Sequence, residues 1–453
     1  MPWEFDHGAR SWALAWLAAI PMSLAALLDL GPGFYLPLTW AFFSLGAGAM
    51  SLCAGLWGAR FYGRGPGLVV ALVAASWIDN LYFGGRTYSE VVAAHLLIVA
   101  IYLGEPGNGT AGRNRLLAAG FAATVASMLR MQLGPVALLL WLWRWRDGMR
   151  FVHLSLGAVA ALLLTGLFDS LTWGTPFLPI WQNIQFNLVL GGADTFGVEP
   201  WWWYFDDAWT RWGVMAVPFA GLGLLGARRL PILAAMAALT LVIHIVVPHK
   251  EYRFIVPAVM MASILCGFGL IEAWLWLTRI LQNRLRDAAT LAAGVAVGLV
   301  WLIVSGGNLG TMLNDRIWRG NSSILNMPLT MARRAEICGV GLANINLYLA
   351  GGYTFLHHPV PIYFDNGDNS RLEGFIKARE SYNALMIRRS DVDFFNSLPE
   401  LQPYALDHCA QDHCLLIRPG TCTAGARPPR PTVGRLTTMT PRDPLYPYPV
   451  GIP

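Results

Sequence analysis

The sequence predicts a mainly α-helical, polytopic integral membrane protein with about ten membrane segments and a small mixed α/β region at its C-terminal end. Three observations predict this class. Hydrophobic residues make up 55% of the 453 residues and charged residues only 13%, a balance typical of chains that bury helices in lipid. Apolar stretches long enough to cross a bilayer recur along most of the chain. Arginines are concentrated in every second loop between these stretches.

The apolar segments account for the predicted membrane crossings. They lie near residues 34–57, 67–83, 88–103, 115–130, 133–143, 151–172, 212–227, 230–247, 254–278 and 288–306. The apolar run Ser11–Leu30 is interrupted by Pro21, and counting it as a crossing would reverse the parity of all later loops. We therefore expect it to be a helix lying along the outer surface. Arg130, Gln132 and Pro135 divide residues 115–143 into two short pieces. Either the two form a hairpin around a polar cavity or one of them is re-entrant.

The arginines of alternate loops define the orientation. Each of these loops is separated from the next by an even number of crossings, so the positive-inside rule places all of them in the cytoplasm. The other connections are then external, including the loop 173–211, residues 249–253 and everything after residue 307. The arginines concerned are Arg60, Arg64, Arg113, Arg115, Arg144, Arg146, Arg150, Arg228, Arg229, Arg279, Arg284 and Arg286.

The C-terminal region has a different pattern. Short strands are expected within residues 344–364, and residues 382–389, 391–401 and 413–418 have the patterns of a strand, a helix and a strand. From Gly420 onward, proline, glycine and threonine accumulate without periodicity, which predicts a disordered tail.

The cysteines and the net charge restrict the partners. Cys53 and Cys266 lie in apolar segments and are expected to be buried packing residues. The net charge of +5 is carried by short arginine-rich loops. We therefore attribute this charge to the orientation of the chain in the membrane and expect no nucleic-acid partner. The spacing of the remaining cysteines fits no zinc pattern, and no cofactor is expected, with a divalent metal ion left open. These four cysteines are Cys338, Cys409, Cys414 and Cys422. The spacing of Cys409 and Cys414 is suitable for a disulfide.

The hexapeptide His249–Phe254 (His-Lys-Glu-Tyr-Arg-Phe) is the most informative motif. It separates the apolar runs Leu230–Val247 and Ile255–Leu277. Each charge would cost roughly 2.5–3.5 kcal/mol at the bilayer centre, so the motif lies at a membrane surface or in a wet cavity. Grouped imidazole, ammonium and guanidinium groups suit a lipid-borne phosphate. The alternative is an interfacial turn with snorkelling charges.

The hexapeptide, followed by Pro257, resembles the His-Lys-Glu-x-Arg-Phe signature of the α-mannosyltransferases of GPI-anchor and N-glycan assembly. These are integral membrane GT-C enzymes that use dolichyl-phosphate mannose. Further matches follow the family's order over residues 3–365. They are Trp3-Glu4, Arg10-Ser11 and Pro21; Arg86-Thr87 with Glu90; Asp169, Gly174, Asn187, Gly197 and Trp203-Tyr204, with Trp173 and Phe196 in place of tyrosines; and Gly351-Gly352-Tyr353 to Pro361.

The beginning of the sequence departs from the family's pattern. In the family, a transmembrane helix and an external His-Pro-Asp-Glu motif, which holds the expected catalytic acid, precede the Trp-Glu stretch. This sequence begins at Met1-Pro2-Trp3. We expect either a start codon further upstream or a product without its base. Glu4 and Asp6 are the only early acids, and neither is assigned the missing role.

The resemblance and the chemistry of sugar transfer imply a set of site residues. A carboxylate should accept the acceptor's proton, and cations should stabilise the departing phosphate. The catalytic base is unknown, with Glu251 a weak candidate that we expect instead to pair with a neighbouring cation. The phosphate candidates are His249, Lys250, Arg253 and Arg86, the last of which has ordinary loop charge as its alternative. The candidates for binding sugar or acceptor are Asp169, Asn187, Trp202, Trp203 and Tyr204. Their alternatives are a structural acid for Asp169 and an interfacial aromatic belt for the tryptophans.

Taken together, the patterns predict a glycosyltransferase that moves a hexose, mannose as the resemblance implies, from a polyprenyl (dolichyl-type) phosphate to a glycan or glycolipid acceptor on the outer face. Alternatives are a transporter or flippase for lipid-linked sugars and an inactive remnant that binds sugar lipids. The Ala, Arg, Gly and Trp bias favours a bacterial inner membrane, with the endoplasmic reticulum as the eukaryotic equivalent. The expected domains are 1–33, a remnant of the first external loop with an interfacial helix; 34–306, the transmembrane glycosyltransferase domain; 307–419, the external α/β region; and 420–453, the tail.

Overall fold

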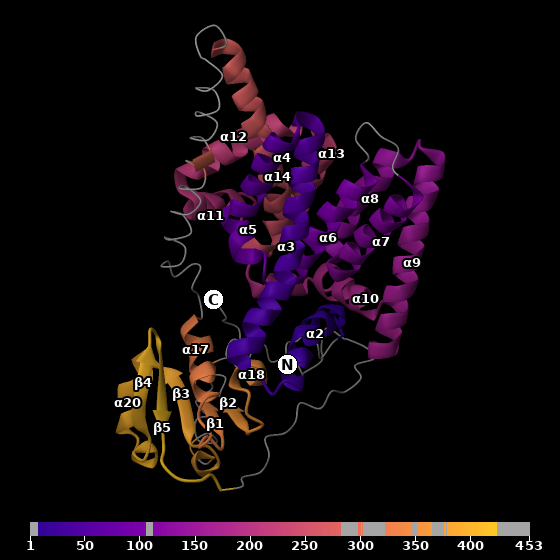
Figure 1. Ribbon diagram of the computed structural model, residues 1–453. Coiled ribbons are helices and arrows are strands. Elements are labelled where there is room, and N and C mark those ends of the chain that lie inside the picture. Colours follow the sequence, from indigo (N-terminus) through magenta and orange to yellow (C-terminus); the bar gives the residue numbers. More distant parts are fainter. Residues whose placement is uncertain are drawn as a thin grey trace. The chain divides into compact units, whose positions relative to one another are not determined.

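The computed structural model describes residues 8–105, 112–281, 298–299, 301, 322–345, 351–364, 376 and 378–423. The chain forms two compact units (Figure 1). The helical unit contains Gly8–Ile20 and Thr39–Thr311, and the C-terminal unit contains Met1–His7, Pro21–Leu38 and Met312–Pro453. The early acids Glu4 and Asp6 and most of the expected segment 288–306 lie outside the described residues.

The first part of the chain is almost entirely helical, as predicted. Its helices are α2 (Ala13–Leu27), α3 (Pro32–Tyr62), α4 (Arg64–Ser76), α5 (Ile78–Phe83), α6 (Ser89–Gly104), α7 (Arg113–Leu129), α8 (Gly134–Arg144), α9 (Gly148–Trp173), α10 (Leu178–Ile184), α11 (Trp203–Trp212), α12 (Ala216–Ala227), α13 (Pro231–Val246) and α14 (Tyr252–Leu281).

Among the residues that the structure describes, three helices are long and apolar enough to cross a membrane: α3, α9 and, over Tyr252–Arg279, α14. In α14, 83% of the most apolar stretch is buried inside the protein, against 22% in α3 and in α9. The membrane-protein class is thereby confirmed, and α14 is the central helix of the helical unit. The outward apolar faces of α3 and α9 are suited to lipid.

Glycines allow α14 and α12 to approach closely. A Cβ atom on Gly226 would lie 1.9 Å from the carbonyl oxygen of Leu265, and one on Gly269 would lie 1.9 Å from that of Leu222. The contact is reciprocal, so neither glycine can be replaced without moving a backbone. Small residues at such crossings are a common means of packing membrane helices. Helix α14 also packs against α13, α4 and α6.

The predicted break within residues 115–143 is confirmed. Helix α7 ends at Leu129, a 3-10 turn covers Met131–Leu133, and α8 begins at Gly134. The break places Arg130 directly after α7, beside the beginning of α6.

Two other expectations from the sequence were too simple. The loop 173–211 contains α10, a π-helical turn over Gln185–Val189, a 3-10 turn over Gly192–Phe196 and the start of α11. These elements are too short to show a clear period. Helix α2 continues through Pro21 instead of being interrupted there, and the apolar proline ring is buried. A single proline removes one hydrogen bond and does not have to end a helix.

The C-terminal unit contains the small mixed α/β fold that was predicted. Its sheet has the order β2-β1-β3-β5-β4, parallel from β2 to β3 and antiparallel from β3 to β4. The strands are β1 (Val340–Leu342), β2 (Ile362–Phe364), β3 (Ala384–Arg388), β4 (Ala405–Ala410) and β5 (His413–Ile417), and the helices are α17 (Ser322–Met331), α18 (Gly352–Leu356) and α20 (Val392–Ser397).

Strand β3 is the centre of this sheet. Ala384 and Met386 join an apolar cluster with residues of α17, whereas Leu385 and Ile387 join a second cluster with Phe395 of α20. Alternate residues of the strand therefore face opposite layers, and both faces of the sheet are covered. This explains why the strand has a continuous apolar pattern.

Two disulfides hold the C-terminal unit together. Cys409–Cys414 links β4 to β5, which confirms the pairing that the spacing allowed. Cys338–Cys422 ties the residues before β1 to those after β5. It was not predicted, because nothing local relates two cysteines separated by 84 residues. Cys53 and Cys266 are free and buried, as expected.

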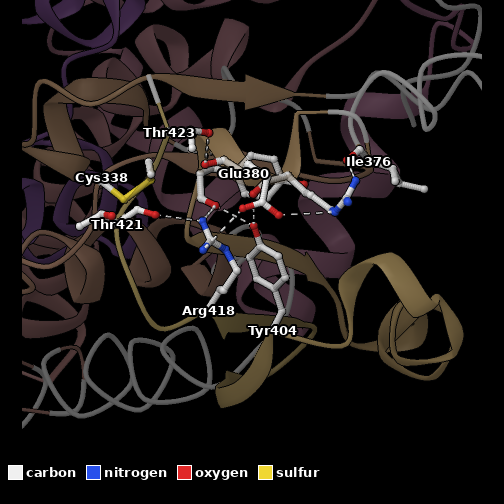
Figure 2. Close-up of polar contacts among 10 residues, drawn as sticks. Cys338, Ile376, Glu380, Tyr404, Arg418, Thr421 and Thr423 are labelled. Atoms are coloured by element: carbon white, nitrogen blue, oxygen red, sulfur yellow. Dashed lines mark hydrogen bonds and ion pairs between the residues drawn. A yellow bond between two sulfur atoms is a disulfide. The ribbon is translucent and has the colours of Figure 1, made fainter. Parts of the chain in front are cut away.

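Polar contacts reinforce the second disulfide (Figure 2). Arg418 donates to the carbonyl oxygens of Tyr382 and Thr421 and lies 3.9 Å from a carboxylate oxygen of Glu380. The backbone N–H of Thr423 donates to the carbonyl of Glu380 at 2.9 Å. The segment that follows β5 is therefore held against the sheet on both sides of the disulfide.

We predict that the two disulfides contribute unequally to stability. A disulfide stabilises a fold because it lowers the conformational entropy of the unfolded chain. Cross-linking residues 84 apart should stabilise the unit by about 4 to 5 kcal/mol, and cross-linking residues 5 apart by about 2 kcal/mol. Limited proteolysis of the full-length protein should therefore cleave the C-terminal unit faster in Cys338→Ser/Cys422→Ser than in the matched control Cys409→Ser/Cys414→Ser. Equal cleavage rates would contradict this account.

Candidate active site

The hexapeptide forms the connection between α13 and α14 and the first turn of α14. Helix α13 ends at Val246, and Pro248 follows an extended residue, as proline requires. His249, Lys250 and Glu251 form the connection, and α14 begins at Tyr252. The motif thus lies where a long apolar helix begins, which keeps its charges away from the middle of the helix.

Charges of alternating sign join this turn to two other helices. We call the series His249, Glu251, Arg253, Glu90 and Arg130 the ion-pair row. His249 Nε2 lies 3.3 Å from Glu251 Oε1, and Arg253 Nε lies 2.7 Å from Glu251 Oε2. Arg253 Nε also lies 3.6 Å from Glu90 Oε1, and Arg130 Nη2 lies 3.1 Å from the same oxygen. The row therefore connects the start of α14, the start of α6 and the end of α7.

The ion-pair row runs from the surface into the protein. The side chain of Glu251 is 37% exposed and that of Arg253 is 29% exposed. The side chain of Arg130 is only 10% exposed, and that of Glu90 is 1% exposed. Buried charges are tolerated when they are paired, and here each carboxylate contacts two cations.

The pairing shifts the pKa values of the two members in the connection. The hydrogen bond to Glu251 raises the pKa of His249, against the opposing effect of burial. Burial alone would raise the pKa of Glu251, but the hydrogen bond from His249 and the charge of Arg253 outweigh it and lower the pKa to about 2. Glu251 is therefore ionised at neutral pH and a weak proton acceptor, and the cationic form of His249 is favoured.

Two of the four phosphate candidates make other contacts. Nζ of Lys250 donates to the carbonyl oxygen of Val247 at 2.7 Å, and the residue is buried. Arg86 lies over the rings of Tyr82 and Trp40, at 4.5 Å and 5.7 Å from their centres. No ion pair joins either cation to the ion-pair row within the described residues. His249 and Arg253 are the two candidates that the structure brings together.

Asp169 and Asn187 lie in separate places. The hydroxyl of Ser11 donates to Asp169 Oδ1 at 2.9 Å, and Trp173 Nε1 donates to the carbonyl of Arg10 at 3.2 Å. The Arg10-Ser11 stretch therefore packs against the end of α9. Asn187 is half-buried in the π-helical turn, where its amide donates to Asn183 Oδ1 at 2.9 Å. Such turns often occur at functional sites.

The aromatic run at the start of α11 divides between surface and interior. Trp202 is 52% exposed and Trp203 is half-buried. Tyr204 is 1% exposed, and its hydroxyl lies near enough to Glu251 for the backbone and charge of that residue to affect the tyrosine pKa, which burial raises. Of the predicted sugar-binding residues, Tyr204 is thus the one that adjoins the ion-pair row.

Asp79 holds the start of α14 in place through hydrogen bonds. It was not identified as a site residue from the sequence. It is fully buried on α5, where it accepts hydrogen bonds from the hydroxyl of Tyr252 at 2.5 Å and from Trp212 Nε1 at 2.8 Å. The guanidinium of Arg211 lies 4.1 Å from the centre of the Tyr252 ring. One carboxylate therefore joins α5, α11 and α14, and it fixes the start of α14.

Glu90 and Arg130 were also missed as site residues. Glu90 belongs to the Arg-Thr motif, and Arg130 was read as a break in an apolar stretch. An ionisable residue within an otherwise apolar segment was the available signal for both, because such residues are expensive unless they are functional or paired. Within the described part of the chain, no three His, Cys, Asp or Glu side chains gather as metal ligands would.

The fold is similar to that of a known membrane enzyme. The crystal structure of ArnT from Cupriavidus metallidurans bound to undecaprenyl phosphate superposes with a TM-score of 0.58 at 13% sequence identity, over 90% of this chain and 87% of ArnT. Together with the long apolar helices, this likeness defines an integral membrane protein of the GT-C fold class. The structural class agrees with the one predicted from the sequence.

The sequence defines the family. Residues 1–317 match the Alg9-like mannosyltransferase family, and the chain belongs to it. Human GPI alpha-1,2-mannosyltransferase 3 is 27% identical over 212 residues, which cover 44% of this chain and 37% of that protein. The Drosophila melanogaster Dol-P-Man:Man(7)GlcNAc(2)-PP-Dol alpha-1,6-mannosyltransferase is 27% identical over 198 residues, 43% of this chain and 29% of the relative. The matched parts span roughly a quarter to a half of such relatives.

We predict that Asp79 stabilises the turn through its two hydrogen bonds. Asp79→Ala would leave the donors of the buried Tyr252 and the half-buried Trp212 without this acceptor, at up to about 1–3 kcal/mol each, whereas Tyr252→Phe removes one donor and leaves Asp79 its hydrogen bond from Trp212. Asp79→Ala should therefore lower the unfolding temperature of the detergent-solubilised protein more than Tyr252→Phe. If Asp79→Ala unfolded at the wild-type temperature, this anchoring role would be wrong.

Proposed function

We propose that the protein is a glycosyltransferase that moves a hexose, namely mannose, from a polyprenyl phosphate to a glycan or glycolipid acceptor at the membrane surface. The observation that carries the proposal is the ion-pair row. It holds Arg253 and His249 at fixed positions beside each other, at the end of a membrane-embedded helix. Family membership and the mannosyltransferase names of the relatives support the choice of mannose. The undecaprenyl phosphate of the ArnT structure supports the lipid carrier.

In the proposed reaction, the acceptor hydroxyl attacks the anomeric carbon while the bond from that carbon to the phosphate oxygen breaks. The phosphate leaves with the electron pair, so negative charge builds on its oxygens. Arg253 offers guanidinium donors and the protonated His249 adds a second positive charge, both held in place before the reaction begins. Nδ1 of His249 contacts the carbonyl oxygen of Gly197, so its Nε2–H would be shared between Glu251 and the phosphate. Such preorganised donors lower the barrier because they need no reorientation as the charge develops.

The proposal gives Glu251 an electrostatic role and leaves the base unassigned. Both carboxylate oxygens of Glu251 contact cations, and a pKa of about 2 makes the group a poor acceptor of the hydroxyl proton. Glu251 would therefore orient Arg253 and favour the protonated form of His249. Tyr204, Asp169, Asn187, Trp202 and Trp203 remain the proposed contacts for sugar and acceptor.

We also propose the topology expected from the arginine pattern. About ten crossings would place the hexapeptide and the C-terminal unit outside the cytoplasm. Two disulfides in the C-terminal unit support its placement outside the cytoplasm, because such bonds persist in oxidising compartments. The proposed membrane is a bacterial inner membrane, with 34–306 as the transmembrane domain and 307–419 as the external region.

We predict that Arg253→Ala lowers kcat/KM for polyprenyl-phosphate mannose by about 10²–10³, the loss typical of removing one preorganised donor to a developing charge. Arg253→Lys should recover only part of the rate, because an ammonium keeps the charge and loses the fork. His249→Ala should also impair transfer. The matched control is Arg113→Ala, at the exposed start of α7. Normal turnover in Arg253→Ala would refute the assigned role.

We further predict a pH dependence that is set by His249. Its raised pKa extends the cationic form to higher pH than an ordinary histidine has, so kcat/KM for the donor should be highest below that pKa and fall as the pH rises through it. The groups that face the imidazole are Glu251, Arg253 and the carbonyl of Gly197. Glu251→Gln removes the largest raising influence, so the fall should move to lower pH. A fall at the same pH in both proteins would assign the titration to another group.

A further inference from the structure

Arg130 is the cation of the ion-pair row that has no role in the proposed phosphate site. It follows the last residue of α7 and is 9% exposed. Its guanidinium carbon lies 4.8 Å from the centre of the Phe254 ring, which places the group over the last residue of the hexapeptide. Arg130 therefore lies against the motif as well as against Glu90.

The hydrogen bonds of Arg130 are incomplete. A guanidinium has five N–H donors, and Nη2 lies 3.1 Å from Glu90. The Nε atom of Arg130 is buried and has no hydrogen-bond partner among the described residues. A buried donor without a partner costs about 1–3 kcal/mol, so its presence in a native site calls for a ligand or another purpose.

A second buried polar atom without a partner lies in the same neighbourhood. Nδ1 of His244 lies 2.8 Å from the carbonyl oxygen of Thr240, and its Nε2 atom has no partner within the described part of the chain. His244 is close enough to Arg130 and Glu90 to interact with both electrostatically. Two such atoms near one another indicate a polar site and not a single packing defect.

The carboxylates of the ion-pair row are already shared. Glu90 Oε1 lies within 3.6 Å of nitrogen atoms of both Arg130 and Arg253, and Glu251 is divided between Arg253 and His249. When His249 is protonated, the row has three cations and two anions, with a cation at each end. The surplus charge suits an anion, and the shared oxygen brings the two guanidiniums close enough for one phosphate group to contact both.

We propose that Arg130 is a second guanidinium ligand for the phosphate of a polyprenyl lipid, acting beside Arg253. This inference rests on the proposed function. A phosphodiester carries one negative charge, whereas the phosphate monoester that leaves carries about −1.5 to −2 at neutral pH. The guanidinium of Arg130 stabilises this additional negative charge, and Glu90 holds Arg130 and Arg253 next to each other. If Arg130 only neutralised Glu90, replacing Arg130 should leave the preference for the phosphate-bearing lipid unchanged.

The test compares lipids that differ only in the phosphate. The affinities of the full-length protein in detergent for undecaprenyl phosphate and for undecaprenol are measured, and their ratio reports the phosphate contact alone. Arg130→Gln should reduce the wild-type ratio at least tenfold, and Arg130→Lys should reduce it less. Arg113→Gln is the matched control, since it lies at the other end of α7, about 25 Å away, and should leave the ratio unchanged.

The outcomes separate this inference from the proposed function. A wild-type protein that binds the two lipids equally would overturn both. A wild-type preference for the phosphate that persists in Arg130→Gln and Arg130→Lys would overturn the role of Arg130 alone. If Arg130→Gln does not fold, Arg130→Lys decides: a ratio equal to that of the wild type refutes the contact by the guanidinium fork, and a reduced ratio supports it.

Discussion

The position of Arg253 is the constraint on which the site depends. Its guanidinium lies between two carboxylates, Glu251 in the adjoining turn and Glu90 on α6, and it is fixed before any ligand arrives. Arginine in a flexible loop would lose side-chain entropy on binding phosphate, whereas this one has already lost it on folding. Asp79 adds a second anchor, because it holds the neighbouring Tyr252 and therefore the start of α14. The turn is consequently rigid on both sides.

The membrane makes this arrangement necessary. Charges at the start of α14 would be costly in lipid, and the protein reduces that cost by pairing every member of the ion-pair row. Helix α14, whose first turn carries part of the row, approaches α12 closely through glycines further along its length, at Gly226 and Gly269. Tight packing of apolar helices therefore supports a polar site at their ends.

Much of the fold was predictable because its signals are local. Composition and apolar run lengths predicted the helical membrane class, and the spacing of Cys409 and Cys414 allowed their disulfide. The partners of Glu90, Arg130 and Cys338 were not predictable, since each depends on residues that only folding brings together. The hexapeptide drew attention to the charges at the start of α14, but its spacing did not reveal that Lys250 contacts the backbone and that Arg253 pairs with the buried Glu90.

A structure of the full-length protein with undecaprenyl phosphate bound, determined by electron cryo-microscopy, tests the central claim most directly. We predict that the phosphate oxygens lie within hydrogen-bond distance of the guanidinium of Arg253 and of the imidazole of His249, with Glu251 and Glu90 still paired to Arg253. A phosphate bound elsewhere, for instance at Arg86, with the ion-pair row unchanged and without ligand contact, would contradict the account.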